Sequence, residues 1–139
     1  LYLDAQICHR IYIAQNALTR AYRPLLKEFD LTYPQFIILM SLWEKDNKSI
    51  FELLDHTKMD GGSTTQILSK LKQKSLIKIT IDKEDGRKKF IKLTKKALEL
   101  ESKMDTVPNK IACHMPSIDT KEAKELYRVM DKMILDLLS

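Results

Sequence analysis

The sequence is 139 residues long, 44% apolar and 31% charged, and its formal net charge is +5, which suits one domain with a buried core. No run approaches the roughly 20 apolar residues of a membrane span, and no signal-peptide pattern opens the chain, so we expect no membrane association and a cytoplasmic location. Two cysteines are too few for a disulfide scaffold and the three histidines are scattered, so we expect neither a metal site nor a cofactor.

Two helices are predicted before residue 46. The first runs from Leu3 to about Phe29, where apolar residues at steps of three and four form a single stripe. Pro24 lies inside it and is expected to bend the helix or mark a local break. The second runs from Pro34 to about Lys45, with its proline in the first turn, where a missing N–H does no harm. It is apolar almost all round and should be central to the core.

The stretch from Ser49 to Thr94 predicts a winged helix-turn-helix. Ser49-Ile-Phe-Glu52 has the form of a capping box, and Asp60 can cap a second helix. In that second helix apolar residues recur at helical spacing and polar residues fill the other faces. Two apolar runs, Leu76–Ile81 and Lys88–Leu93, are separated by residues typical of turns, which predicts a hairpin.

The remaining chain is expected to be helical. Thr94 opens a helix through about Asp105, Val107-Pro108 and Met115-Pro116 interrupt the pattern, and Asp119 caps a last helix. Surplus apolar residues at both chain ends suggest that the termini pair with a second copy. The predicted fold is mainly α with a small β-wing. It is a single domain over 1–139, with a winged helix-turn-helix at about 32–94 and dimerisation helices at about 1–30 and 95–139.

The charge is concentrated in the winged stretch. Residues 58–92 hold nine lysines and one arginine against four acidic residues, a net +6, so the rest of the chain is close to neutral. A basic surface on one such unit is the electrostatic footprint of a double-stranded DNA binder. A solvated lysine-rich face is the alternative, and the small polar residues that begin the second helix of the motif favour DNA.

Four stretches resemble the MarR family of bacterial repressors, and within it the organic-hydroperoxide-sensing OhrR branch. They are Leu3-Asp-Ala-Gln-Ile-Cys8, Arg20-Ala-Tyr-Arg-Pro-Leu-Leu26, Leu31-Thr-Tyr-Pro-Gln35 with the following Leu42-Trp-Glu44, and Asp85-Gly-Arg87. The similarity covers nearly the whole chain. It implies a homodimeric repressor that binds a palindromic DNA operator when reduced and is released when organic peroxide, the signal, oxidises it.

The resemblance also implies roles for the thiols and tyrosines. Cys8 matches the peroxide sensor, Tyr22 and Tyr33 match the partner subunit's tyrosines that hold its thiolate, and Cys113 resembles the resolving thiol that closes an intersubunit disulfide. Tyr12, one turn from Cys8, is a same-chain neighbour. On one straight helix Tyr22 would lie about 21 Å beyond Cys8, so they meet only through a fold-back or a second subunit.

Plainer interpretations of these residues remain open. Free cysteines are most often buried small apolar residues. Interface tyrosines can use any hydrogen-bond partner.

For DNA, the resemblance assigns one helix to the major groove and the wing tip to the minor groove. The matching residues are Gly61, Ser63, Thr65, Gln66 and Lys70 on the helix, and Asp85, Arg87 and Lys88 on the wing. Two departures matter. Gly61–Gln66 stands where the branch usually has Ser-Gly-Thr-Leu-Thr-Pro, which can change the operator that is read. Lys78 and Thr80 stand in a strand where arginines are usual, and lysine makes poorer bidentate contacts.

Two other functions compete with peroxide sensing. A MarR-type regulator released by a small phenolic ligand at the interface would leave the cysteines incidental, and its release would survive cysteine-to-serine substitution. A thiol peroxidase would turn over peroxide with a thiol reductant. No second catalytic constellation or nucleotide-binding glycine loop accompanies the cysteines, so we expect the chain not to be an enzyme.

Overall fold

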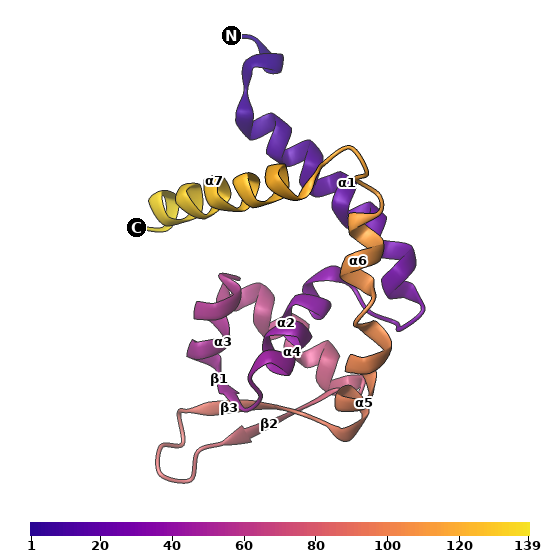
Figure 1. The fold of residues 1–139 in the computed structure, drawn as a ribbon. Coiled ribbons are helices and arrows are strands. Elements are labelled where there is room, and N and C mark those ends of the chain that lie inside the picture. Colours follow the sequence, from indigo (N-terminus) through magenta and orange to yellow (C-terminus); the bar gives the residue numbers. More distant parts are fainter. The chain divides into compact units, whose positions relative to one another are not determined.

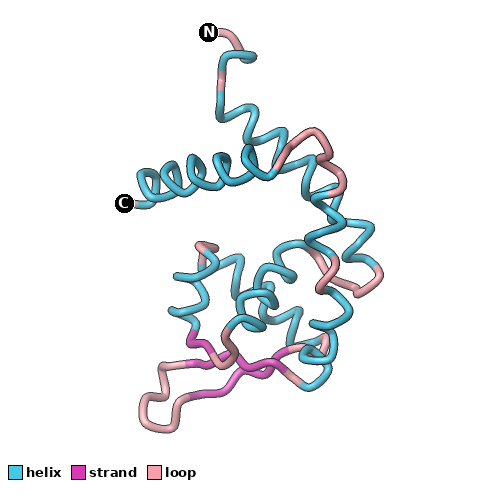
Figure 2. The backbone as a smooth tube through the Cα atoms, viewed as in Figure 1, coloured by secondary structure: helices cyan, strands magenta, loops and turns pink.

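Helices make up most of the chain, and one small sheet lies near its middle in sequence (Figures 1 and 2). The structure is a computed structural model that describes residues 1–139. The chain divides into an N-terminal unit, Leu1–Val107, and a C-terminal unit, Pro108–Ser139. The predicted class, mainly α with a small β-wing, is confirmed.

The first helix is shorter than predicted. A 3₁₀ turn at Leu3–Ala5 precedes α1, which runs from Ile7 to Lys27. The helix continues through Pro24, so the alternative of a break there is wrong. Pro24 is exposed and lies in the last turn, so its ring removes one backbone hydrogen bond without disturbing the core.

Helix α2, Tyr33–Glu44, is the centre of the N-terminal unit, as its all-round apolar sequence predicts. Thr32 and Gln35 form a capping box at its start. Phe36, Ile38, Leu39 and Leu42 are almost completely buried. The Trp43 indole N–H donates to the carbonyl oxygen of Ala97 at 2.9 Å, which fastens α2 to α5, Lys95–Met104.

The predicted helix-turn-helix is confirmed as α3, Ile50–Thr57, and α4, Gly61–Gln73. Ser49 and Glu52 form the expected capping box at the start of α3. Lys58 ends α3 in the left-handed conformation at a φ of 56°, and Asp60 caps α4. Local capping residues therefore set both ends of the turn.

The wing is a hairpin of β2, Ile77–Ile81, and β3, Lys89–Leu93, each within one residue of its predicted start. Ile79 is paired with Ile91 in antiparallel register. A strand that the sequence did not predict, β1 at Lys48–Ser49, pairs with the other edge of β3, so the order is β1-β3-β2.

The C-terminal unit consists of most of α6, Val107–Ala112, and of α7, Thr120–Leu138. The interruptions predicted near residues 107 and 116 fall beside the start of α6 and between α6 and α7. The expected Asp119 cap is present as a capping box with Glu122. No residue of α7 is buried. None of the helices has the length and apolar content that crossing a membrane would require.

Candidate nucleic-acid interface and thiol site

The start of α4 is held by its own cap. The Asp60 carboxylate accepts a hydrogen bond from the backbone N–H of Ser63 at 2.9 Å, and this bond lowers the pKa of Asp60. Because the carboxylate satisfies one of the free N–H groups of the first turn, the helix can begin abruptly at an exposed surface.

Helix α4 has a buried face and a free face. Thr64, Leu68 and Leu71 are buried against the core. The residues expected to read DNA are all exposed and lie on the remaining faces: Gly61, Ser63, Thr65, Gln66 and Lys70. The Thr65 hydroxyl donates to the Gly61 carbonyl oxygen at 2.8 Å, so its oxygen still has a lone pair for an outside donor.

The wing tip is an ordered turn. Asp85 accepts from the backbone N–H of Arg87 at 3.0 Å, and its carboxylate lies 3.6 Å from the Arg87 Nε. The Arg87 side chain is 97% exposed, and Lys88 is exposed beside it. The tip therefore presents a cation that Asp85 orients at its base.

A buried lysine fastens the wing to the helices. Lys48 in β1 is 5% exposed, and its Nζ donates at 2.8 Å to the Ser41 carbonyl oxygen and to His56 Nδ1. The other ring nitrogen, His56 Nε2, lies 3.1 Å from a carboxylate oxygen of Glu44. Residues of α2, β1 and α3 thus meet in one polar cluster, which fixes the third strand and, through it, β3.

The two tyrosines predicted for the thiol site are brought together within one chain. The ring centroids of Tyr22 in α1 and Tyr33 in α2 are 4.5 Å apart, and Phe36 lies 6.2 Å from Tyr22. Burial raises the pKa of Tyr33. The pair forms where α1 packs on α2.

The cysteines are not part of that aromatic cluster in a single chain. Cys8 lies in the first turn of α1, and the helix is unbroken to Tyr22, so the two are about 21 Å apart along the axis. Tyr12, one turn after Cys8, is 63% exposed. Cys113 follows α6 in the C-terminal unit. Both cysteines are exposed in the single chain.

Sequence reasoning missed two features beside these residues. One is a groove between the start of α3 and the wing, in which Phe51 and Lys89 take part. The other is Lys74 at the end of α4, whose Nζ donates to the Gln35 side chain at 3.0 Å. Lys74 and Lys89 both belong to the basic stretch 58–92, and nothing in the sequence pattern predicts that one is tied to α2 and the other lines a groove.

A family model described as transcriptional regulator SarA/Rot matches residues 20–104. MgrA of Staphylococcus aureus is 32% identical over 133 residues, which is 95% of this chain and 90% of MgrA. The chain belongs to the SarA/Rot family of transcriptional regulators. Its relatives MgrA and TtmR are helix-turn-helix transcriptional regulators and not enzymes. The alternative function as a thiol peroxidase is therefore excluded.

Other similarities agree with this assignment of a MarR/SarA-type winged-helix regulator. TtmR of Methylorubrum extorquens is 38% identical over 109 residues, or 78% of this chain, and the chain spans only 56% of TtmR. The fold is that of reduced AbfR bound to DNA, with a TM-score of 0.78 and 23% identity over 99% of this chain and 95% of AbfR. BpsR of Bordetella bronchiseptica is also similar, with a TM-score of 0.87 and 20% identity over 96% of both chains. The DNA binding of BpsR is regulated by 6-hydroxynicotinic acid.

Proposed function

We propose that this SarA/Rot-family regulator is a dimeric, OhrR-like repressor that binds a palindromic operator while Cys8 is reduced. Organic peroxide oxidises Cys8, and the protein then leaves the DNA. One observation carries the proposal. An exposed thiol at the start of α1 and a preformed tyrosine pair lie about 21 Å apart along one helix, so only a second subunit can unite them.

Unpartnered apolar surface supports the dimer. Leu3, Ile7 and Ile13 near the N-terminus are at least 49% exposed. In α7, Tyr127 and Leu135 are about 70% exposed. A helix without buried residues is marginal in water, so a second copy is the natural cover. We infer that residues 1–139 act as one MarR-type domain in the cytoplasm, with 32–94 reading DNA and 1–30 and 95–139 forming the dimer.

The chemistry uses both cysteines. The Cys8 thiolate attacks one oxygen of the peroxide O–O bond, and the other oxygen leaves as the alcohol after taking a proton. Cys8 becomes a sulfenic acid. The Cys113 thiolate of the partner subunit then attacks that sulfur, and the hydroxyl group leaves as water after taking a proton from solvent, so that a disulfide remains. Tyr22, Tyr33 and Tyr12 are the hydroxyl donors that can stabilise the Cys8 thiolate before it reacts.

On DNA, the exposed residues of α4 read base edges and Arg87 enters the minor groove. Ser63, Thr65 and Gln66 offer hydroxyl and amide groups, while Lys70 neutralises phosphate. Gly61 lets the DNA backbone approach closely. Asp85 orients Arg87, and Lys88 extends the cationic wing tip. A disulfide between α1 of one subunit and the C-terminal unit of the other would change the spacing of the two α4 helices and break their register.

A mixing experiment tests the intersubunit disulfide. Cys8→Ser and Cys113→Ser chains are treated with cumene hydroperoxide separately and after subunit exchange, and then run on a non-reducing gel. Only the mixture, and the wild type, should form a covalent dimer that dithiothreitol reverses. A disulfide within one chain, or covalent dimers of Cys113→Ser alone, would contradict the pairing.

A ligand-released regulator is the second candidate. The Tyr22–Tyr33–Phe36 cluster could hold a small phenolic ring, and the structurally similar BpsR responds to an aromatic acid. Release of the Cys8→Ser variant by such a ligand, with no effect of peroxide on wild type, would favour this candidate.

A further inference from the structure

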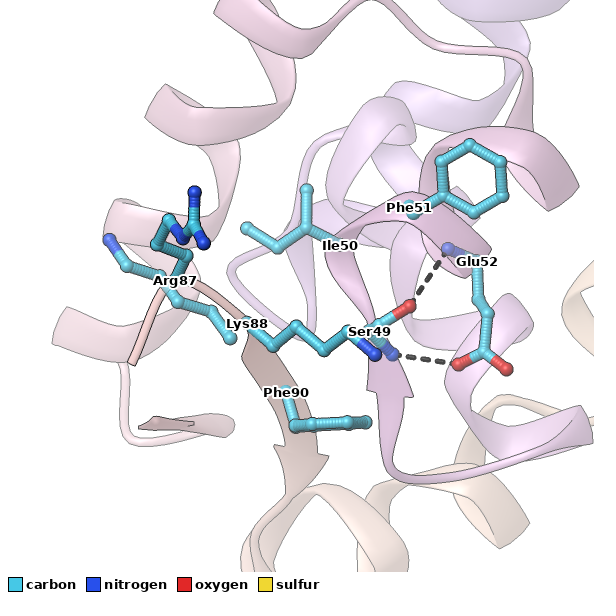
Figure 3. A pocket seen from close by; sticks show the side chains of 8 residues that line it. Ser49, Ile50, Phe51, Glu52, Arg87, Lys88 and Phe90 are labelled. Atoms are coloured by element: carbon cyan, nitrogen blue, oxygen red, sulfur yellow. Dashed lines mark hydrogen bonds between the residues drawn. The ribbon is translucent and has the colours of Figure 1, made fainter. Parts of the chain in front are cut away.

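A groove runs between the start of α3 and the wing. Residues Ser49–Glu52 line one wall and Arg87–Phe90 line the other. Figure 3 shows Arg87 and Phe51 on opposite sides of Ile50, so the groove has a cationic end and an aromatic end. The core of the domain does not fill it, since Phe51 is 81% exposed.

The charges around the groove favour an anion. Arg87, Lys88 and Lys89 are exposed along one wall. Glu52 is the only acidic residue among the lining residues, and its carboxylate already has partners outside the wing wall. It accepts from the Ser49 backbone N–H at 2.8 Å, which lowers its pKa, and lies 3.7 Å from the Lys45 ammonium. Arg87 is paired with Asp85, so Lys88 and Lys89 are the two cations of the wing wall that remain available to an outside partner.

The apolar residues of the groove favour a partner that has apolar as well as anionic groups. Ile50, Phe51 and Phe90 give the groove an apolar strip beside the cations. A sugar–phosphate strand alternates an anionic phosphate with the apolar carbons of deoxyribose, and so matches both parts. An inorganic anion would use the cations and leave the aromatic ring exposed.

The position of the groove is consistent with that partner. Helix α3 leads through one turn into α4, and β1 beside its start pairs with β3 of the wing. When α4 occupies a major groove and the wing tip the adjacent minor groove, the phosphodiester strand that separates the two grooves must cross between them. The first helix of a helix-turn-helix commonly crosses the DNA backbone.

We propose that this groove clamps one sugar–phosphate strand of duplex DNA, with Lys89 contacting a phosphate and Phe51 packing on a deoxyribose. The inference rests on the proposed DNA-binding function and adds a contact that carries no sequence information. The clamp strengthens binding to any duplex equally and leaves the choice of operator to α4.

Fluorescence anisotropy with a labelled duplex of arbitrary sequence tests the clamp across a series of KCl concentrations. Non-specific binding depends on phosphate contacts, so the operator need not be known. For Lys89→Gln, the slope of log affinity against log salt should fall by about 0.9 per subunit. Phe51→Ala should lose about fivefold affinity per subunit at every salt concentration with an unchanged slope, because about 1 kcal/mol, the lower end of the range for aromatic stacking on a base, corresponds to about fivefold.

Lys95→Gln is the matched control, because Lys95 is 91% exposed on α5 and outside the groove. Circular dichroism should find all three variants folded, since none removes a buried side chain. Lys89→Gln and Phe51→Ala proteins that bind like Lys95→Gln would overturn the clamp and leave the groove to another partner, such as an acidic peptide. A wild type that binds no duplex would instead overturn the proposed function.

Discussion

At the scale of single residues, Thr64 is the least expected feature of α4. Its hydroxyl oxygen is buried beside the core and has no hydrogen-bond partner, whereas its neighbours Ser63 and Thr65 are exposed and the Thr65 hydroxyl donates to the Gly61 carbonyl oxygen. A buried hydroxyl without a partner costs free energy, because it gives up its hydrogen bonds to water. The sequence shows three hydroxyl residues in a row, and only the helical phase decides which one faces inward.

Thr64→Val should therefore stabilise the protein. Valine keeps the branched shape and removes the unsatisfied hydroxyl, so the free energy of unfolding should rise by about 1 kcal/mol. Urea denaturation followed by circular dichroism measures this, with Thr65→Val as the exposed control. A loss of about 1 kcal/mol in Thr64→Val would contradict this and show that the buried hydroxyl is satisfied.

At the scale of elements, Lys74 connects α4 to the turn between α1 and α2, which Tyr33 follows. It is the C-cap residue of α4, and its Nζ donates to the Asp30 carbonyl oxygen and to the Gln35 side chain. Gln35 is 3% exposed and belongs to the capping box of α2, two residues after Tyr33. A movement of the α1–α2 turn would therefore displace the C-terminal end of α4 through the hydrogen bonds of Lys74.

Lys74→Met should loosen this connection. Its side chain is 25% exposed, and methionine keeps the aliphatic stem but donates no hydrogen bond, so we expect a loss of about 1–2 kcal/mol in stability. Lys72→Met, which changes an exposed residue of the same helix, should cost little. Equal unfolding midpoints for the two variants in urea would show that the Lys74 contacts contribute nothing.

At the scale of the whole molecule, the sequence predicts what local rules decide. Ser49, Asp60 and Asp119 can be recognised as helix caps because each side chain can accept a hydrogen bond from the backbone N–H three residues later. The hairpin is predicted by the apolar runs on either side of a turn-rich segment. Strand β1 has only two residues and forms because β3 lies beside it. Two residues are too few for an alternating pattern, so local sequence rules cannot predict this strand. Tyr22 and Tyr33 meet through packing of α1 on α2, which spacing alone does not reveal.

The roles proposed for the thiols come from the family resemblance and not from local sequence rules. Helical spacing alone requires that Cys8 and Tyr22 be separated in one chain, and the unbroken α1 agrees. Which residues of a second subunit approach Cys8 depends on the exposed apolar stripes of both units, and a single chain cannot specify how such stripes pair. The proposed response to oxidation therefore has to be measured on the dimer.

Release of DNA by peroxide tests the proposed redox switch most directly. The reduced protein first selects an operator from a pool of random duplexes, and fluorescence anisotropy then measures its affinity before and after cumene hydroperoxide. We expect oxidation to weaken binding by at least about tenfold, within the usual range of allosteric coupling. Dithiothreitol should restore the affinity, and Cys8→Ser should bind equally with and without peroxide. Wild-type affinity that peroxide leaves unchanged, or equal release of Cys8→Ser, would contradict the account.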